Sequence, residues 1–364
     1  MTQPSSNLSE EEAESWKETW RPMVSAVGSD LSKGLVIRGA EVIEASTVRR
    51  YLEPLEFDCA LHYDRIIAVK NGYANITAPY TSILTYTISP MWEPGRPLFV
   101  SNERNAQPAY SPINGGELRV APEVTGFFAT DFELTFVRPP LVGEHLSRRG
   151  NVLKACVPKW VSVGRGAFMT LESEVVTDNT EVIGLVRHTV FAYEPMPPRQ
   201  TPHGSRDSIS VSNESEQEIP VKSQHSSERV GPRVGDVLPP MEFPLTVYRM
   251  VMAAGANRDF NSIHHNSEYA RETGATGMYA NTSFLLGTWE RSIRSFIGLG
   301  GTIRSIKGFR MKSFNPVGTT LLVKGEILEV SEEDQDLVVV ISIWCENGGV
   351  VTVGPGTATV TMPK

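Results

Sequence analysis

The chain has 364 residues, of which 40% are hydrophobic and 21% charged, and its formal net charge is −8. This length is enough for two domains of ordinary size, each with its own core. The acidic balance argues against a nucleic-acid binder, which usually carries a basic excess, and no apolar run approaches the length of a membrane span. We therefore expect a globular protein without nucleic-acid or membrane partners.

The cysteines and the terminal segments indicate the cellular compartment of the protein. Cys59, Cys156 and Cys345 are scattered, without a CxxC pair or a histidine at metal-ligand spacing. This pattern indicates buried thiols in a reducing compartment, with neither disulfides nor a zinc site. The chain begins without a basic-then-apolar signal and ends in TMPK, which is not a peroxisomal address, so we expect a cytoplasmic protein. Nucleotide-binding glycine loops, a serine-hydrolase elbow and metal-ligand clusters are also missing from the sequence, and we expect no metal and no separate cofactor.

The first half has a clear order of elements. Residues 1–29 are expected to form a helical segment, because Ser9 and Glu12 make a capping-box pattern. In residues 30–195 a strand at 34–44, a helix capped near Ser46 or Thr47 and an apolar stretch precede strands at 132–140, 145–157, 166–177 and 181–194. One long apolar helix followed by an antiparallel meander that wraps it is the order of a hot-dog fold. Residues 88–120 look like an inserted loop, a lid or an edge cover.

The second half repeats this order after a linker. Residues 196–231 are rich in Pro, Ser and charge, a composition that predicts a disordered linker. In residues 232–364 we expect a strand at 234–245, a helix capped by Thr246, a central helix at 282–298, and strands at 309–330, 336–349 and 350–363.

The two halves also match in sequence. FELTFVRPPLVGEHL aligns with FRMKSFNPVGTTLLV, and FMTLESEVVTDNTEVIGLVRHTVFAY aligns with LVVVISIWCENGGVVTVGPGTATV. A repeat of this size implies two copies of one fold packed as a pseudo-dimer. The predicted fold class is therefore α+β, a tandem (double) hot-dog in which each antiparallel sheet wraps around a central helix.

The stretch most suited to chemistry is residues 253–287. Asp259 and His264 are five positions apart, with Asn261 between them, in a polar loop that follows an apolar helix-like run. A carboxylate and an imidazole held close together can divide one proton-transfer task. The alternative is an Asx-turn aspartate beside a surface histidine, which D-x-N sequences often form.

The residues DFNSIHHNSEYA resemble the D-x-N-P-[ILV]-H-x-D-x-x-x-A signature of the MaoC-like, (R)-specific enoyl-CoA hydratases, which have the hot-dog fold. The resemblance implies that Asp259 and His264 are the catalytic pair and that Asn261 is the intervening motif Asn. Three positions depart from the pattern. Ser262 replaces Pro, Arg258 replaces Gly, and Asn281-Thr282 stands where the family has His-Gly at the start of the central helix. A backbone N–H survives the change from Gly to Thr, so the oxyanion donor remains available.

The resemblance implies reversible hydration of a trans-2-enoyl-CoA to an (R)-3-hydroxyacyl-CoA, with coenzyme A as part of the substrate. Asp259 would activate the water and His264 would act as its acid partner. The N–H of Thr282 would stabilise the enolate-like oxygen, with Asn261 and Asn281 in positioning roles. His265 is read as a bystander.

The repeat provides an internal comparison. The first copy, EFDCALHYD, keeps His62 but has Phe57 and Cys59 where the second copy has Asp259 and Asn261, and Asp58 is displaced by one position. Ala78-Pro79 lies near the place of Asn281-Thr282, and proline has no N–H to offer. We expect a non-catalytic first domain. This resembles double hot-dog hydratases whose N-terminal copy is a degenerate dehydratase-like domain.

Coenzyme A also needs cations. Between Glu290 and Glu326 there is no acidic residue, and this run is a candidate phosphate site, formed by Arg291, Arg294, Arg304, Lys307, Arg310 and Lys312, with Lys324 beyond them. A solvated charged face is the alternative.

Two other functions remain open: a hot-dog acyl-CoA thioesterase, for which Glu290 is the obvious carboxylate, and a catalytically dead subunit of a larger complex. Double hot-dogs often pair again, so we expect a homodimer.

Overall fold

The computed structural model describes residues 15–111, 122–124, 126–161, 163–195 and 231–364. The predicted capping box at Ser9 and Glu12 and nearly all of the predicted linker lie outside the described residues. The described part of the N-terminal segment is helical, as predicted, and forms η1 (Ser15–Trp20) and α2 (Arg21–Ser25). The domain boundaries at 30, 196 and 232 stay predictions.

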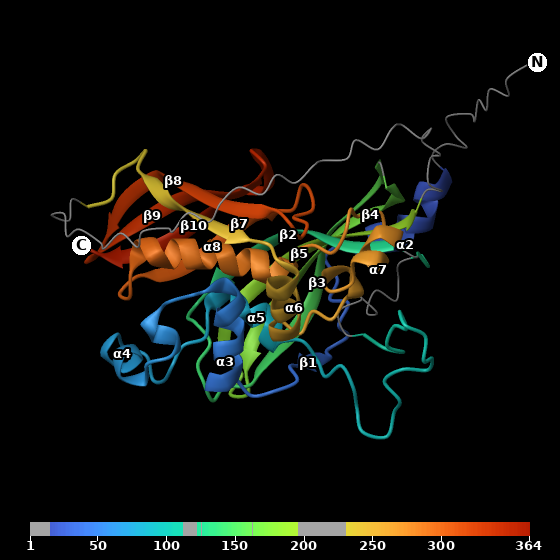
Figure 1. Ribbon diagram of the computed structural model, residues 1–364, viewed down its shortest axis with the longest axis horizontal. Helices are drawn as coiled ribbons and strands as arrows, with labels where there is room; N and C mark the ends of the chain where they lie inside the picture. Colours follow the sequence, from blue (N-terminus) through green and yellow to red (C-terminus); the bar gives the residue numbers. More distant parts are fainter. Residues whose placement is uncertain (1–14, 112–121, 125, 162, 196–230) are drawn as a thin grey trace, which may run out of the picture.

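In the part of the chain that the structure describes, ten antiparallel strands form one sheet in the order β1-β3-β4-β5-β2-β7-β10-β9-β8-β6 (Figure 1). The strands of the first half are β1 (Val36–Arg38), β2 (Gly126–Phe136), β3 (Leu146–Val161), β4 (Gly164–Thr177) and β5 (Val182–Pro195). Those of the second half are β6 (Val237–Pro244), β7 (Thr302–Arg310), β8 (Thr320–Glu333), β9 (Asp336–Asn347) and β10 (Val350–Pro363).

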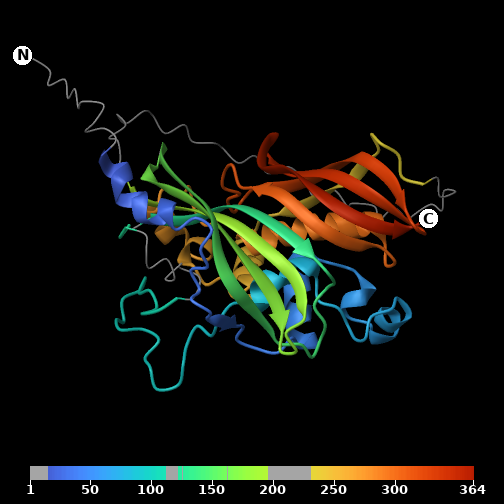
Figure 2. The ribbon, with the colours of Figure 1, turned by 180° about the vertical axis from the view of Figure 1, so that it is seen from behind.

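The two halves of the sheet have the same topology. Read from its outer edge, each half contains its first, third, fourth, fifth and second strand in that order, and the halves meet where β2 pairs with β7. Figure 2 shows the two sets of strands as one continuous surface seen from behind. The predicted pseudo-dimer of two hot-dog units is therefore confirmed in its strand order.

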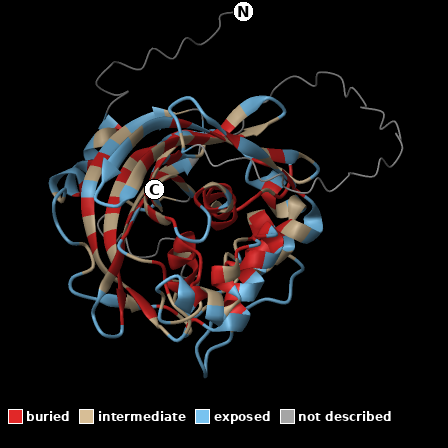
Figure 3. Cartoon of the chain, turned by 90° about the vertical axis from the view of Figure 1, so that its left-hand side faces the viewer, coloured by how far each residue is buried: buried red, intermediate tan, exposed pale blue. Residues whose placement is uncertain are grey.

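The central helix of the second half is α8 (Thr282–Ile297), as the sequence predicts. Twelve of its residues are buried, and Figure 3 shows a buried helix with the sheet curving around it. Gly287 lets the first half approach this helix, because a Cβ at that position would lie 2.6 Å from Leu55 Cδ1. The cores of both halves therefore meet at α8, and their buried side chains form one cluster.

The prediction of a long central helix in the first half is wrong. Its place is taken by η4 (Tyr80–Ser82) and α5 (Ile83–Tyr86), only seven residues together. The remaining helical elements are α3 (Ala45–Leu52), η2 (Glu53–Leu55), η3 (Ala60–His62), α4 (Arg65–Lys70), α6 (Val247–Ala256), η5 (Ser262–His264) and α7 (Ser267–Glu272).

Two strand predictions also need correction. The strand predicted at 34–44 is reduced to the three residues of β1. The segment 309–330, read as one strand, contains the end of β7, a turn and most of β8. All three cysteines are free and buried, as predicted. Among the described residues, no helix is long and apolar enough to cross a membrane.

Candidate active site

The loop that carries the predicted catalytic pair is shaped by a cap and a left-handed residue. Thr246 begins α6 by accepting a hydrogen bond from the N–H of Arg249 at 3.1 Å, which confirms the predicted cap. After α6 the chain turns at Arg258, whose φ is +57°. This conformation favours glycine, the residue of the hydratase signature at this position. The turn directs the following residue, Asp259, out of the helix.

Asp259 and His264 face each other. The carboxylate Oδ2 lies 3.5 Å from Nε2 of the imidazole, and their side chains are 21% and 9% exposed. Nδ1 of His264 lies 2.9 Å from the carbonyl oxygen of Tyr279. A carbonyl only accepts hydrogen bonds, so Nδ1 carries a proton and Nε2 is the nitrogen directed at the carboxylate. The pair can therefore engage one water molecule from two sides.

The neighbours of the pair have supporting roles. Asn261 caps η5, with its side-chain oxygen accepting from the N–H of Ile263 at 3.3 Å, so it shapes the loop. Burial, followed by the charge of Asp259, raises the pKa of the Tyr279 hydroxyl, which stays protonated near the pair. Burial and the nearby His264 lower the pKa of His265. Tyr279 also packs its ring edge-on against His264, with centroids 5.2 Å apart. Sequence reasoning missed Tyr279, because it lies fifteen residues after His264 and outside the signature.

The start of α8 provides a backbone donor beside this loop. Asn281 is the N-cap, and its side-chain oxygen accepts from the N–H of Phe284 at 2.8 Å and from the amide of Asn257 at 3.2 Å. Thr282 is the first helical residue, where backbone N–H groups have no partner within the helix. Tyr279, which contacts His264, lies three residues before Thr282, so the start of α8 follows closely on the segment that holds the imidazole.

The equivalent site of the first half is built differently. Nδ1 of His62 lies 2.9 Å from the carbonyl oxygen of Thr77, which repeats the His264 contact fifteen residues apart in both halves. The ring of Phe57 packs edge-on against His62, with centroids 5.1 Å apart. Nε2 of His62 is buried without a hydrogen-bond partner, and Asp58 is exposed. His62 thus faces a phenyl ring where His264 faces a carboxylate.

The matching histidine contacts correct the predicted alignment by one residue. Thr77 corresponds to Tyr279, so Pro79 corresponds to Asn281 and Tyr80 to Thr282. Tyr80 does have an N–H, but it donates to Glu290 Oε1 at 2.7 Å. A carboxylate of the second half therefore occupies the place that an oxyanion would take in the first.

Glu290 is unsuited to the thioesterase role that the sequence left open. Its side chain is fully buried, and Oε2 accepts from the N–H and from the hydroxyl of Thr81, each at 2.7 Å. With Tyr80 this makes three donors around one carboxylate. Burial raises the pKa of Glu290, while these hydrogen bonds and Arg294 act in the opposite direction. The Glu290 carboxylate therefore joins the second half to Tyr80 and Thr81 of the first half.

The predicted cation cluster is divided by the fold. Arg294 is 4% exposed and donates to the carbonyls of Gly298 and Gly301, so the structure places it apart from the exposed cations of the cluster, and its assignment to coenzyme A stays a prediction. It lies about 18 Å along the helix axis from Thr282. Arg291 donates to the carbonyl of Leu55, and its guanidinium lies over the ring of Phe243.

Of the other four cations, three lie on β7 and Lys312 lies just beyond it. Arg304 pairs with Glu333 at 2.7 Å, at the end of β7 nearest the C-terminus of α8. Lys307, Arg310 and Lys312 lie further along β7 and just beyond it, and all three are exposed. The residue before Lys312 is Met311, whose sulfur lies 3.6 Å from the hydroxyl of Thr282. This second group lies toward the first residue of α8, because β7 runs back along the helix.

Within the described part of the chain, no group of three or more His, Cys, Asp or Glu side chains could hold a metal ion. What the structure does bring together is the carboxylate of Asp259, the imidazole of His264 and the half-buried Tyr279, which lies three residues before the start of α8.

No protein-family model matches the sequence, and no curated protein sequence matches it. Solved structures do. A MaoC-like dehydratase superposes with a TM-score of 0.65 at 16% identity, covering 91% of this chain and 99% of that chain. A MaoC-like dehydratase from Phytophthora capsici gives 0.56 at 12% identity, covering 94% and 99%. A conserved hypothetical protein from Mycobacterium tuberculosis, which has a double hotdog fold, gives 0.56 at 12% identity, covering 93% and 99%. The chain therefore has the double hot-dog fold that the MaoC-like dehydratases share.

Proposed function

We propose that this protein is a hydro-lyase that adds water to a trans-2-enoyl-CoA, giving an (R)-3-hydroxyacyl-CoA, and that catalyses the reverse dehydration. The observation that carries the proposal is the 3.5 Å approach of Asp259 Oδ2 and His264 Nε2 beside the N-terminus of α8. The double hot-dog fold shared with MaoC-like dehydratases supports the same reaction class. Coenzyme A enters as part of the substrate.

The proposed mechanism divides two proton transfers between the pair. Asp259 removes a proton from the bound water as its oxygen bonds to the β-carbon. His264, protonated on Nε2, delivers that proton to the α-carbon, while the Tyr279 carbonyl holds Nδ1–H. The N–H of Thr282 donates to the thioester oxygen as negative charge develops on it. Return of the proton from Asp259 to His264 restores the starting state, so one water is added and nothing else is consumed.

The first half is proposed to shape the site without catalysing. His62 has a phenyl ring in place of an acidic partner, and the N–H of Tyr80 is engaged by Glu290. Neither the water-activating pair nor a free oxyanion donor is therefore present at that position.

The test is hydration of crotonyl-CoA. Loss of the enoyl absorbance without release of free thiol is the expected result. Asp259→Asn and His264→Ala should each lower kcat by about 10²–10⁴-fold. The matched controls in the first half, Asp58→Asn and Phe57→Leu, should leave kcat within a few-fold of wild type.

Release of free thiol would instead identify a thioesterase. No reaction with crotonyl-CoA or with longer trans-2-enoyl-CoA esters would indicate a non-catalytic subunit. Hydration that persists in both Asp259→Asn and His264→Ala would show that the wrong pair has been assigned.

A cytoplasmic location and a homodimeric state also remain proposals. Double hot-dog proteins often pair again, which supports a homodimer, and sedimentation of the full chain tests it.

A further inference from the structure

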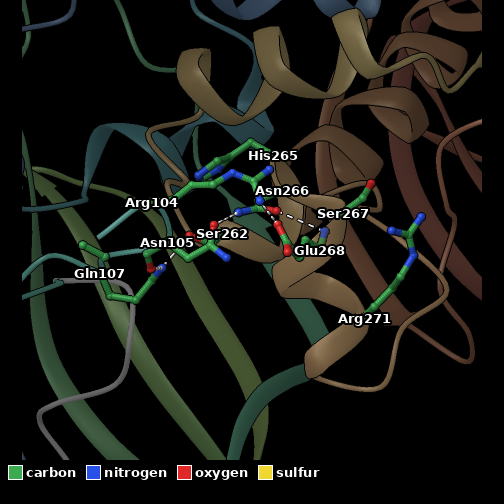
Figure 4. Close-up of a pocket in the computed structure, with 10 residues that line it drawn as sticks. Arg104, Asn105, Gln107, Ser262, His265, Asn266, Ser267, Glu268 and Arg271 are labelled. Atoms are coloured by element: carbon green, nitrogen blue, oxygen red, sulfur yellow. Dashed lines mark hydrogen bonds and ion pairs between the residues drawn. The ribbon is translucent and has the colours of Figure 1, made fainter. Parts of the chain in front are cut away.

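A cavity of about 730 Å³ lies between the two halves, next to the catalytic loop (Figure 4). One wall is the inserted segment of the first half, and the other is formed by the catalytic loop and α7 of the second. The lining residues are Arg104, Asn105, Ala106, Gln107, Ser262, His265, Asn266, Ser267, Glu268 and Arg271. Ser262 and His265 flank His264 in the chain, so the cavity adjoins the proposed active site without containing the pair itself.

The inserted segment is fixed to the opposite wall by three polar contacts. The side-chain oxygen of Gln107 accepts from the hydroxyl of Ser262 at 3.1 Å. The side-chain oxygen of Asn105 accepts from the amide of Asn266 at 2.9 Å. Arg104 forms an ion pair with Glu268. These contacts join a segment that the sequence marked only as a lid or edge cover to the loop that carries the catalytic pair.

The lining is polar and has a cationic excess. Arg104 and Arg271 contribute two guanidinium groups against the single carboxylate of Glu268. Nε of Arg271 donates to the carbonyl of Thr276 at 3.1 Å, which fixes the stem of that side chain on the cavity wall. The side-chain amides of Gln107 and Asn266 already donate to Asn105, so the two guanidinium groups are the main donors of the lining. An apolar acyl chain gains little from such walls, whereas a group with charged oxygens is matched by the arginine donors.

The division of the predicted cation cluster makes this cavity more significant. Arg294 is buried and Arg304 is paired near the far end of α8, which leaves Lys307, Arg310 and Lys312 of that cluster toward the first residue of α8. Arg104 and Arg271 add a second set of cations, which lines a space that begins at the loop of Asp259 and His264.

We propose that the cavity binds an oxyanion group of the substrate, with Arg271 and Arg104 as its main ligands. The inference rests on the proposed function. Two parts of an enoyl thioester can supply such a group: a phosphate of coenzyme A, or a carboxylate at the end of the acyl chain. In either case the inserted segment of the non-catalytic half acts as a specificity element for the catalytic half.

The experiment compares four thioesters: crotonyl and trans-glutaconyl groups, each carried by coenzyme A or by pantetheine. Pantetheine lacks the phosphates, and the crotonyl group lacks the carboxylate. In Arg271→Gln we expect KM to rise by about tenfold, with kcat nearly unchanged, for every substrate that bears the recognised group. Arg104→Gln should act in the same direction, and the double variant should add to it.

The pattern across the four substrates identifies the group. A rise confined to the two coenzyme A esters assigns the phosphate, and a rise confined to the two glutaconyl esters assigns the carboxylate. Unchanged KM for all four would overturn the proposal. The control is Arg38→Gln, which removes an exposed arginine that is likewise paired with a carboxylate, Asp178, but lies at the outer edge of the sheet.

A binding measurement separates this inference from the proposed function. Calorimetric titration with free coenzyme A, and with glutarate, reports on the cavity even if no thioester is hydrated. Weakened binding of either ligand in Arg271→Gln, with normal binding in Arg38→Gln, would support the site independently of catalysis. Equal binding of both ligands in wild type and Arg271→Gln would contradict it.

Discussion

At the scale of single residues, the backbone N–H of Thr282 can be removed without removing the helix that presents it. Thr282 is the first residue of α8, the position where proline is tolerated, because its missing N–H has no partner within the helix. The preceding Asn281 has ψ of 162°, an extended conformation that a following proline favours. A Thr282→Pro variant therefore tests the proposed oxyanion donor directly.

We predict that Thr282→Pro lowers kcat for crotonyl-CoA by about 10²–10³-fold, the usual effect of losing one oxyanion donor. Thr282→Gly is the matched control. It keeps the N–H and restores the residue of the hydratase signature, so its kcat should equal or exceed that of wild type. Melting temperatures should show that both variants are folded. Comparable kcat values for the proline and glycine variants would remove this N–H from the mechanism.

At the scale of elements, the contact between α8 and the short η4–α5 segment depends on Glu290. The carboxylate receives two N–H groups and one hydroxyl, all from Tyr80 and Thr81, across 209 and 210 residues of sequence. Both oxygens are needed, because the donors are divided between them. The carboxylate thus accepts hydrogen bonds from the backbone N–H groups at the start of the η4–α5 segment, which is too short to be a stable helix by itself.

We predict that Glu290→Gln destabilises the protein by about 1–3 kcal/mol, because a glutamine offers one oxygen and leaves a buried donor without an acceptor. Chemical denaturation at pH 7 measures the change. Glu333→Gln, at an exposed ion pair with Arg304, should leave the stability close to that of wild type, because solvent screens exposed pairs. If the two variants were equally stable, the carboxylate would not be what joins the halves.

Elements with strong local signals could be predicted from the sequence. The apolar run from Thr282 predicted α8, and Thr246 predicted the start of α6. The resemblance to the hydratase signature pointed to Asp259 and His264, which lie 3.5 Å apart, and their catalytic role stays a prediction. The prediction of a long helix in the first half was wrong. The apolar run there is rich in threonine and forms only seven helical residues, a length that the match between the two halves does not indicate. Local propensity decides little where tertiary contacts fix the length.

Features that depend on how elements fold back on one another could not be predicted. The cations from Arg291 to Lys312 are neighbours in sequence, yet a helix and the strand that returns along it place them at opposite ends. The contacts of Gln107 with Ser262 and of Glu290 with Tyr80 join residues 155 and 210 positions apart. No pattern within either segment indicates its partner.

At the scale of the whole molecule, one hydrophobic cluster runs through both halves, so the two hot-dog units should unfold together. His62 lies in the first half, 2% exposed, and burial followed by the charge of Arg294 on α8 lowers its pKa to about 3. In the unfolded chain the pKa of this imidazole returns to its ordinary value, about 6.5. Between these pH values the unfolded state binds more protons than the folded state, so stability falls as the pH drops below about 6.5 and continues to fall toward pH 3.

We predict that this one histidine removes about 2 kcal/mol of stability between pH 7 and pH 5. His62→Gln cannot titrate, and its amide can still donate to the carbonyl of Thr77. Its stability should therefore depend less on pH in this window, even if it is lower at pH 7. The measurement is urea denaturation of both proteins at pH 7 and pH 5, followed by circular dichroism and by crotonyl-CoA hydration. Because His62 belongs to the half without the catalytic pair, coincident loss of structure and activity in wild type would show that the halves unfold as one unit. An identical pH dependence in the two proteins would mean that His62 does not titrate with unfolding.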